Sequence, residues 1–379
     1  MEEKKERAII FSGGGSRFAI YSGIYAALEE LGHKPDLIIG SCGGGMATNI
    51  ISSFKTNIER KEYLKSLEFY NFIKKISLTK ERKLYKIGLD FKIRGIRNKK
   101  NNYIEDIFNK YLLDIPENVE DFLPTLAKSQ GPYISNIIIG SKILFNKFEV
   151  GEKVNGRKLY KEIYMTDIKT KKLIEENWLS QKSKIFLNSS LSEKIEIRTD
   201  IPLLKASRIS ASDIFYTNPV FYNGENFSGG FVDLIPIELA KSLSKEVILE
   251  LKQKYKKIEE IALISTVGYS GNERMREVHD FNADYWIDTS DAAKSLKGSY
   301  ISTKINLFKF QVELSIPETY EKYKNDVDIQ WDYGYQRGKE AILSGKNNKK
   351  KMRDANFLNT SEEFRNKRNL SGGKNWKYL

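Results

Sequence analysis

The sequence predicts an α/β fold built on a mainly parallel sheet. Two apolar runs each lead into a glycine-rich turn and then into a helical segment, and the two units follow one another closely in the chain. Strands joined by such a crossover helix lie parallel and adjacent, with both turns at the carboxyl edge of the sheet. A chain of 379 residues with 40% apolar content can also bury one large core, which favours a single α/β domain with additions.

The first unit begins with a strand at Ala8 to Phe11 and continues into a helix from Phe18 to Leu31. The turn between them contains Gly13, Gly14 and Gly15, whose amide groups can converge on an anion or a developing oxyanion. A phosphate-binding P-loop is disfavoured because no Gly-Lys-Ser/Thr ending follows. A dinucleotide-binding turn is disfavoured because the GxGxxG spacing is not completed.

The second unit carries the only cysteine of the chain, Cys42, between a strand at Leu37 to Ile39 and a helix from about Gly44 to Phe54. A strand, GxCxG and a helix are typical of a nucleophile elbow, in which Gly40 and Gly44 allow the strand and helix to approach closely. The helix N-terminus is expected to lower the pKa of the Cys42 thiol. The alternative is a buried structural cysteine beside a tight turn.

In this order of motifs the chain resembles the patatin-like phospholipase family. The family's GGGxRG loop is matched by Gly13 to Gly15 and Arg17, with Phe18 in place of the last glycine, and its GxSxG elbow is matched around Cys42. Three later segments follow the family pattern in the same order: 159–170, 208–220 and 227–236. The resemblance spans about residues 7–290 and implies a three-layer α/β/α fold with a mainly parallel central sheet.

The resemblance also implies the site. Cys42 stands at the serine nucleophile and Ser228 at the aspartate of the catalytic dyad. The oxyanion hole is expected from four glycines: Gly13, Gly14, Gly15 and Gly43. Arg17 is expected to bind the substrate, or alternatively to hold the glycine loop in shape.

Cysteine in place of the nucleophilic serine and serine in place of the aspartate both affect the predicted chemistry. Ser228 is a poor base, but a thiol needs a base less than a hydroxyl does. The chain is therefore either a lipid acyl hydrolase or acyltransferase that uses Cys42, or an inactive relative that binds lipid or acts as a regulatory module. Asp213 and Asp233 are further candidates for the base, although either can equally be a cap or turn residue.

Neither of the two histidines, His33 and His279, completes a triad in the sequence pattern, and the scarcity of Cys and His argues against a metal site. We expect no cofactor. The expected partner is a phospholipid or another acyl lipid.

Charge predicts a second partner. The formal net charge is +13, and basic residues concentrate in 74–100 and 346–379. Such segments are attracted to an anionic membrane surface. No nucleic-acid-binding module accompanies them.

The domain expected at residues 1–345 includes a helical insertion at about 55–130, which is a lid, a membrane-facing surface or a plain packing layer. Residues 346–379 are expected to form a flexible basic tail. Further strands are predicted at 258–267 and 285–287, and a helix at 333–343. The charged N-terminus and the lack of a long apolar run predict a cytoplasmic protein that associates peripherally with the inner membrane surface.

Overall fold

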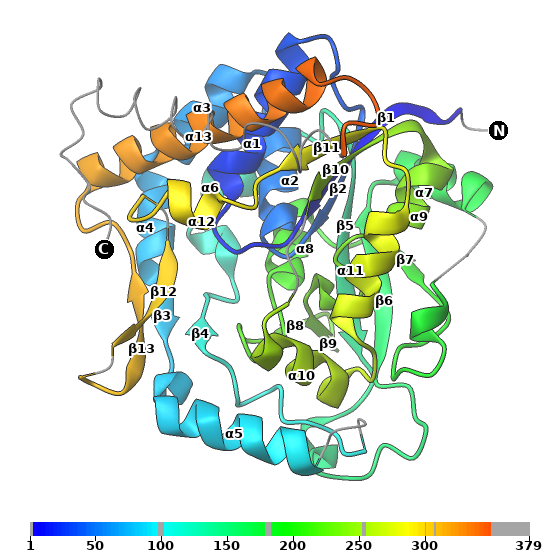
Figure 1. The fold of residues 1–379 in the computed structure, drawn as a ribbon, viewed down its shortest axis with the longest axis vertical. Coiled ribbons are helices and arrows are strands. Elements are labelled where there is room, and N and C mark those ends of the chain that lie inside the picture. Colours follow the sequence, from blue (N-terminus) through cyan, green and yellow to red (C-terminus); the bar gives the residue numbers. More distant parts are fainter. Residues whose placement is uncertain are drawn as a thin grey trace.

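The fold is organised around one central sheet, shown in Figure 1. The computed structural model describes residues 3–97, 102–178, 183–251, 255–299, 301–306 and 308–349. The predicted flexible tail lies outside these residues from position 350 onward. Among the described residues, no helix is both long enough and apolar enough to cross a bilayer.

The central sheet is mainly parallel, as predicted. Its strands lie in the order β11 (Tyr285–Asp288), β10 (Ser244–Leu251), β1 (Lys5–Ser12), β2 (Leu37–Ser41), β5 (Ser135–Ile143), β6 (Tyr160–Thr166) and β7 (Glu196–Arg198). All neighbours in this order are parallel except β5 and β6. A hairpin of β8 (Val220–Tyr222) and β9 (Glu225–Ser228) adds to β5 in antiparallel fashion. Adjacent parallel β1 and β2 bring the two glycine-rich turns to one sheet edge.

Helices cover both faces of the sheet, because successive residues of each strand point to opposite sides. From β1, Ile9 and Phe11 join the core beneath one helical layer, whereas Ala8 and Ile10 join the core on the other face. The first layer contains α1 (Phe18–Glu30), α2 (Gly43–Ser53) and α13 (Tyr320–Leu343). The second contains α7 (Ile168–Asn177), α9 (Ile237–Leu243) and α11 (Gly271–Asp280). This is the predicted three-layer α/β/α arrangement.

One predicted strand is wrong. Residues 258–267 form a helix, α10 (Lys257–Thr266). The strand of this region is β10, which ends at Leu251, seven residues before the predicted strand begins. Glu259 caps the α10 N-terminus. Residues 247–251 are buried on both faces between β1 and β11, which a short apolar run alone does not reveal. The strand predicted at 285–287 and the helix predicted at 333–343 are confirmed.

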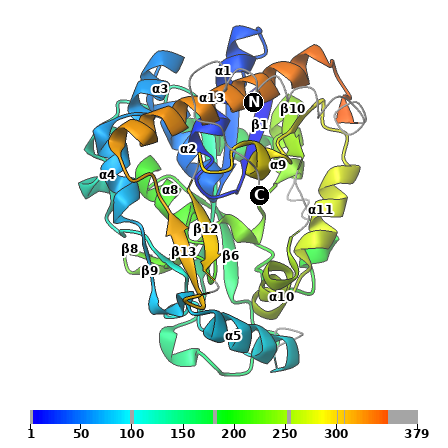
Figure 2. The same cartoon turned by 60° about the vertical axis from the view of Figure 1, so that its left-hand side comes forward.

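The remaining elements fall into two groups along the chain. Those between α2 and β5 are α3 (Asn57–Leu64), α4 (Leu67–Lys75), β3 (Ser77–Leu78), α5 (Leu84–Arg97), β4 (Leu113–Asp114) and α6 (Pro124–Ala127). Later elements are α8 (Leu203–Ser210), α12 (Ala292–Ser295), β12 (Ser302–Asn306) and β13 (Gln311–Ser315). Figure 2 shows the β12–β13 hairpin extending along the molecule towards α5.

Candidate active site

Cys42 lies on a strained turn between β2 and α2. Its backbone has φ 52° and ψ −123°, a conformation that side-chain-bearing residues rarely adopt. Its amide donates to Ser210 Oγ at 2.8 Å, and its carbonyl accepts from Gly45 at 2.9 Å. Strain of this kind at a strand-to-helix turn is the geometry of a nucleophile elbow.

The glycines of the elbow are required by close backbone contacts. A Cβ on Gly40 would lie 2.6 Å from the Gly44 carbonyl oxygen, and a Cβ on Gly44 would overlap the Phe11 carbonyl. The two positions therefore allow β1, β2 and α2 to meet, which confirms the role predicted for Gly40 and Gly44.

The two glycine-rich turns meet at the Cys42 side chain. The amides of Gly15 and Gly43 lie close enough to the thiol sulfur to lower its pKa, and a Cβ on Gly13 would lie 3.8 Å from Cys42 Cβ. Gly13, Gly14 and Gly15 all have positive φ values, which glycine adopts without strain. Two amides from different turns thus converge on one atom.

Gly13 differs from the predicted oxyanion role. Its amide donates to the Ser41 carbonyl at 2.9 Å and so ties the first turn to β2. Gly14 lies against Arg17, because a Cβ at Gly14 would lie 2.7 Å from Arg17 Cδ. Of the four predicted glycines, Gly15 and Gly43 are those whose amides face the sulfur.

Burial raises the pKa of the Cys42 thiol well above its usual value, and the nearby Asp213 carboxylate raises it further. The amides of Gly15 and Gly43 act in the opposite direction but do not compensate. The predicted lowering of the thiol pKa is therefore wrong. Cys42 is 7% exposed, so removal from water outweighs the field of the helix N-terminus.

Asp213 is the carboxylate that meets the thiol. It follows α8, and its side chain interacts with Cys42 and with the Phe231 amide. Its Oδ1 is buried and has no hydrogen-bond partner among the residues that the structure describes. Burial raises the pKa of Asp213 to about 6, against the lowering effect of its two partners. The carboxylate is thus ionised at neutral pH beside a protonated thiol.

Ser228 is turned to another partner. It lies at the end of β9, where its hydroxyl donates to the Ser212 carbonyl at 2.8 Å. The next residue, Gly229, lies directly against Asp213, because a Cβ there would overlap Asp213 Oδ1. The space beside the predicted dyad position is therefore filled by a carboxylate from the preceding loop.

Asp213 was one of two alternative bases in the sequence, and nothing in its spacing separated it from a turn residue. The signal that favours it is the glycine pair Gly229-Gly230, which leaves room for a side chain arriving from elsewhere in the chain. The glycine pair points to Asp213 only in the folded structure, where the loop after α8 crosses over these two glycines.

Arg17 holds the loop instead of facing the thiol. Its guanidinium pairs with Glu250 at 2.6 Å and donates to Thr289 at 3.1 Å. Tyr21 lies in the same network, with its hydroxyl 3.0 Å from Glu250 and 2.9 Å from the Ser12 carbonyl. This geometry differs from the expected substrate contact and matches the alternative role that the sequence left open.

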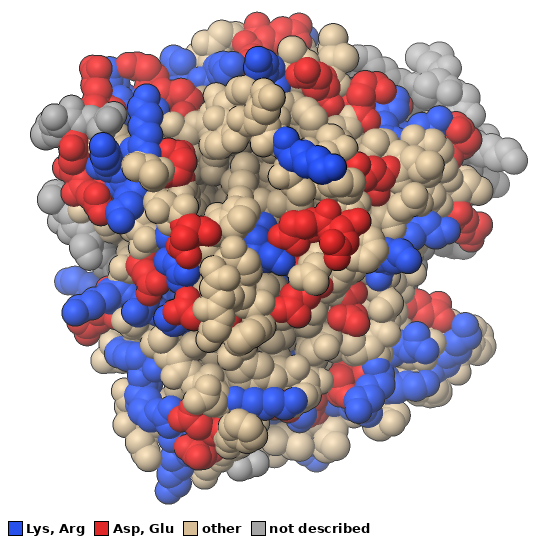
Figure 3. Space-filling view, turned by 180° about the vertical axis from the view of Figure 1, so that it is seen from behind, with Lys and Arg blue, Asp and Glu red and all other residues tan. Residues whose placement is uncertain are grey.

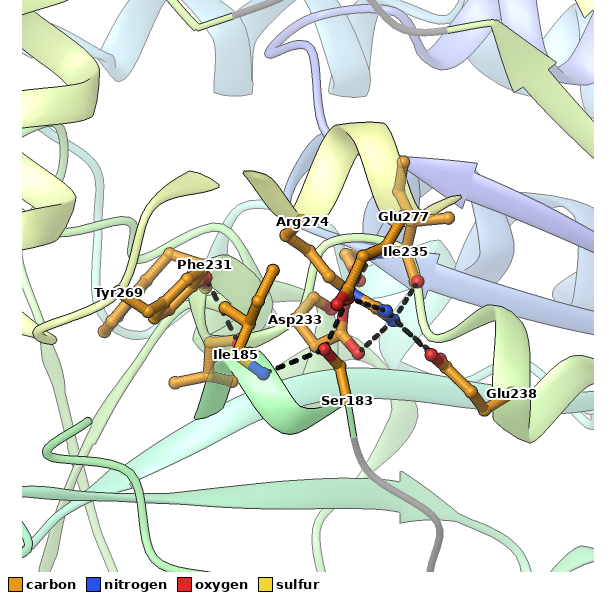
Figure 4. Close-up of polar contacts among 11 residues, drawn as sticks. Ser183, Ile185, Phe231, Asp233, Ile235, Glu238, Tyr269, Arg274 and Glu277 are labelled. Carbon is orange, nitrogen blue, oxygen red and sulfur yellow. Dashed lines mark hydrogen bonds and ion pairs between the residues drawn. The ribbon is translucent and has the colours of Figure 1, made fainter. Parts of the chain in front are cut away.

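Asp233, the other alternative base, belongs to a buried ion-pair cluster. Arg274 of α11 lies between Asp233 and Glu238, with N to O distances of 3.0 and 2.6 Å (Figure 4). Asp233 also accepts from the Ile235 amide at 3.2 Å, as a turn residue does. Burial raises the pKa of Asp233. The cluster fixes the 3₁₀ turn at 230–232, where Gly230 packs against Ser41 and Cys42.

The two histidines lie away from the thiol. The ring of His33 packs against Tyr285, at the first residue of β11, with centroids 5.4 Å apart. His279 of α11 packs on Trp286 with centroids 5.8 Å apart. Both aromatic partners belong to β11, whereas Cys42 follows β2, three strands away in the sheet.

The sequence comparison decides the family. The model of the family described as "Patatin-like phospholipase" matches residues 9–241, more than half of the chain. The chain belongs to the patatin-like phospholipase family. The name gives the general class of chemistry, hydrolysis of lipid acyl esters, and the match includes both glycine-rich turns and Asp213.

Two solved patatin-like structures resemble the chain weakly. VipD from Legionella pneumophila aligns with 12% identity and a TM-score of 0.33, over 91% of this chain and 68% of VipD. Human GIVD cytosolic phospholipase A2 aligns with 11% identity and a TM-score of 0.34, over 90% of this chain and 59% of its own. No curated protein sequence matches the chain significantly.

Proposed function

We propose that this patatin-like protein cleaves acyl esters of phospholipids through a Cys42–Asp213 dyad. The observation that carries the proposal is a protonated thiol on a strained elbow, in contact with a carboxylate whose pKa is about 6. A nucleophile with a high pKa and a base that is ionised at neutral pH are the two parts of a dyad. Cysteine replaces serine, and Asp213 supplies the carboxylate that Ser228 cannot.

In the acylation step, the Cys42 sulfur attacks the ester carbonyl carbon while Asp213 accepts the thiol proton. A thioester forms as the carbon–oxygen bond to the leaving group breaks, and Asp213 gives the proton to the leaving alcohol. The amides of Gly15 and Gly43, which converge on the sulfur, are placed to donate to the carbonyl oxygen as it becomes negative.

The thioester is then transferred to water or to another alcohol. Asp213 accepts the proton of the acceptor, the new carbon–oxygen bond forms, and the sulfur leaves and regains its proton. Water as the acceptor gives a hydrolase, and a lipid alcohol gives an acyltransferase. The same two residues serve both outcomes.

The test uses a soluble activated acyl ester with intact-mass analysis. The wild type is expected to form an acyl adduct that Cys42→Ala abolishes. Asp213→Asn should lower the acylation rate by ~100-fold or more, because a general base contributes about that factor. Ser228→Ala is the matched control, since its hydroxyl serves the Ser212 carbonyl, and it should retain activity within a few-fold of the wild type.

The contrary result is equally clear. A folded wild-type protein that forms no acyl adduct is the inactive lipid-binding alternative. If the rate of adduct formation is unchanged in Asp213→Asn but falls in Ser228→Ala, the general base is Ser228 and not Asp213.

A further inference from the structure

The helix α5 presents an apolar side to solvent. Tyr85, Leu89, Ile93 and Ile96 recur at spacings of four, four and three residues, so they lie on one side of the helix. Between 43% and 75% of each is exposed. Contiguous exposed apolar groups are unusual on a monomeric protein and mark a surface that binds something.

Two charged side chains of α5 pair with residues elsewhere in the protein. Asp90 pairs with Lys110 at 2.9 Å, and Arg94 pairs with Glu105 at 3.4 Å. The Arg94 guanidinium also lies 3.6 Å from the ring centroid of Phe215. These contacts fix the orientation of the helix, so the apolar side is held outward.

A second segment, more than 200 residues away in sequence, adjoins this helix. The β12–β13 hairpin exposes Ile305, Phe310 and the whole of Phe308. Its strand β13 meets the start of α5, where the Leu84 amide donates to the Phe310 carbonyl at 2.9 Å and Lys83 bridges to Gln311. Figure 2 shows the end of the hairpin beside α5. The two segments thus form a combined apolar surface.

Basic residues surround the combined apolar surface. Residues 74–100 contain eleven Lys and Arg against two acidic residues. Lys92 is exposed on α5, and Lys309 is 65% exposed at the hairpin. Figure 3 shows Lys and Arg side chains at the lower end of the back face, together with Asp and Glu.

We infer that the combined apolar surface of α5 and the β12–β13 hairpin docks on an anionic phospholipid bilayer. Exposed aliphatic and aromatic side chains with flanking basic residues are the pattern of an interfacial helix, whose apolar side enters the headgroup region while its cations bind anionic lipid. The excess of positive charge favours this partner over a protein surface, where Lys is depleted.

The docking surface adjoins the candidate active site. Arg94 stacks on Phe215, two residues after Asp213, and α5 packs against α10. Tyr255, just before α10, lies close enough to Asp213 and Cys42 for both to influence its hydroxyl. The helix that carries the docking surface therefore contacts the loop that carries Asp213, and the docking itself does not depend on turnover.

The test is co-sedimentation of the full-length protein with vesicles made of phosphatidylcholine and phosphatidylserine in equal parts. Leu89→Gln with Ile93→Gln keeps the helix but removes two inserting side chains, and it should lower vesicle binding tenfold or more. Phe308→Ser should also lower it. Phe148→Ser is the control, since Phe148 is 95% exposed on a different element, and it should bind as the wild type does.

Cys42→Ala must retain vesicle binding, which separates docking from the proposed chemistry. Binding that is unchanged in the α5 and Phe308 variants, or absent from the wild type, overturns the inference. A second result would also overturn the inference: light scattering that shows a dimer for the wild type and a monomer for the α5 variant. In that case a second copy of the chain would cover this surface. A thermal melt matching the wild type shows that each variant is folded.

Discussion

At the scale of single residues, the site depends on the balance between burial and local dipoles at Cys42 and Asp213. Burial raises the pKa of both groups. The Asp213 carboxylate raises the thiol pKa further, whereas the contact with Cys42 lowers the pKa of Asp213. The carboxylate remains the stronger acid by a wide margin. At neutral pH the pair therefore holds one proton, on the sulfur, which is the starting state that base-assisted attack requires.

The raised pKa of Asp213 predicts how stability depends on pH. A carboxyl group whose folded pKa of about 6 exceeds the ordinary value of 3.8 favours folding when protonated. That contribution is fully present below about pH 4 and is lost as the pH rises through about 6. Asp213→Asn is always neutral, so it should be more stable than the wild type at pH 8, by up to about 3 kcal/mol, and by about half as much at pH 5.

Urea denaturation at the two pH values measures this difference. Asp200→Asn is the control of opposite sign, because Arg198 holds the pKa of Asp200 below its usual value and its stabilisation is present at high pH. Asp200→Asn should therefore lose stability at pH 8. If Asp213→Asn behaves in the same way, Asp213 is stabilised by its charge and is not a base of raised pKa.

The sequence places Cys42 at an elbow but does not single out its proposed partner. Gly40, Cys42 and Gly44 are separated by fixed spacings, and those spacings reflect backbone contacts within one short turn. Asp213 reaches the thiol across the sheet edge from the loop after α8, a contact that no local pattern encodes. The thiol pKa was also mispredicted, since the helix dipole is visible in the sequence and the depth of burial is not.

At the scale of elements, the elbow illustrates why glycine is required where β1, β2 and α2 meet. Gly44→Ala would place a methyl group on the Phe11 carbonyl of β1, so the helix must move away from the sheet. We expect a loss of ~2–4 kcal/mol in the free energy of unfolding, and loss of any adduct at Cys42.

Gly88→Ala in α5 is the matched control. No atom lies within 4 Å of a Cβ at this position, so alanine should stabilise the helix by about 0.5–1 kcal/mol. Chemical denaturation of both variants measures the contrast. A Gly44→Ala variant as stable as the wild type would mean that α2 does not approach β1 as closely as the structure shows.

The wrong strand prediction at 258–267, where the structure has the helix α10, shows the limit of predicting elements from the sequence. Both segments contain short apolar runs, and the periodicity of a run of four or five residues does not separate a central strand from one side of a helix. The distinction comes from neighbours: residues 247–251 lie between two parallel strands, whereas α10 packs against α5 and α11. The first two strands were predictable because their glycine-rich turns marked where each ended.

At the scale of the whole molecule, positive charge and exposed apolar surface act on the same partner over different distances. Electrostatic attraction reaches about 10 Å at 0.1 M salt and only about 3 Å at 1 M, whereas insertion of apolar side chains needs contact and resists salt. We expect the basic residues near the C-terminus to contribute attraction and the combined apolar surface of α5 and the hairpin to contribute insertion.

The point of truncation follows from the structure. Residues 346–349 were assigned to the tail from the sequence, but Asn348 exchanges hydrogen bonds with the Trp286 backbone and Lys346 pairs with Glu246 at 2.5 Å. Removing them would uncover the outer strand β11. A chain ending at residue 349 keeps these contacts and removes eight basic and three acidic residues.

Vesicle binding by this truncated chain should separate the two contributions. At low salt it should bind more weakly than the full chain, since each basic residue near an anionic surface contributes about 1 kcal/mol, and its binding should depend less steeply on salt. At 1 M salt the two chains should bind equally, through the combined apolar surface. Leu89→Gln with Ile93→Gln should show the reverse: attraction at low salt and almost no binding at high salt. Salt-resistant binding that survives in this variant would place the inserting residues elsewhere on the molecule.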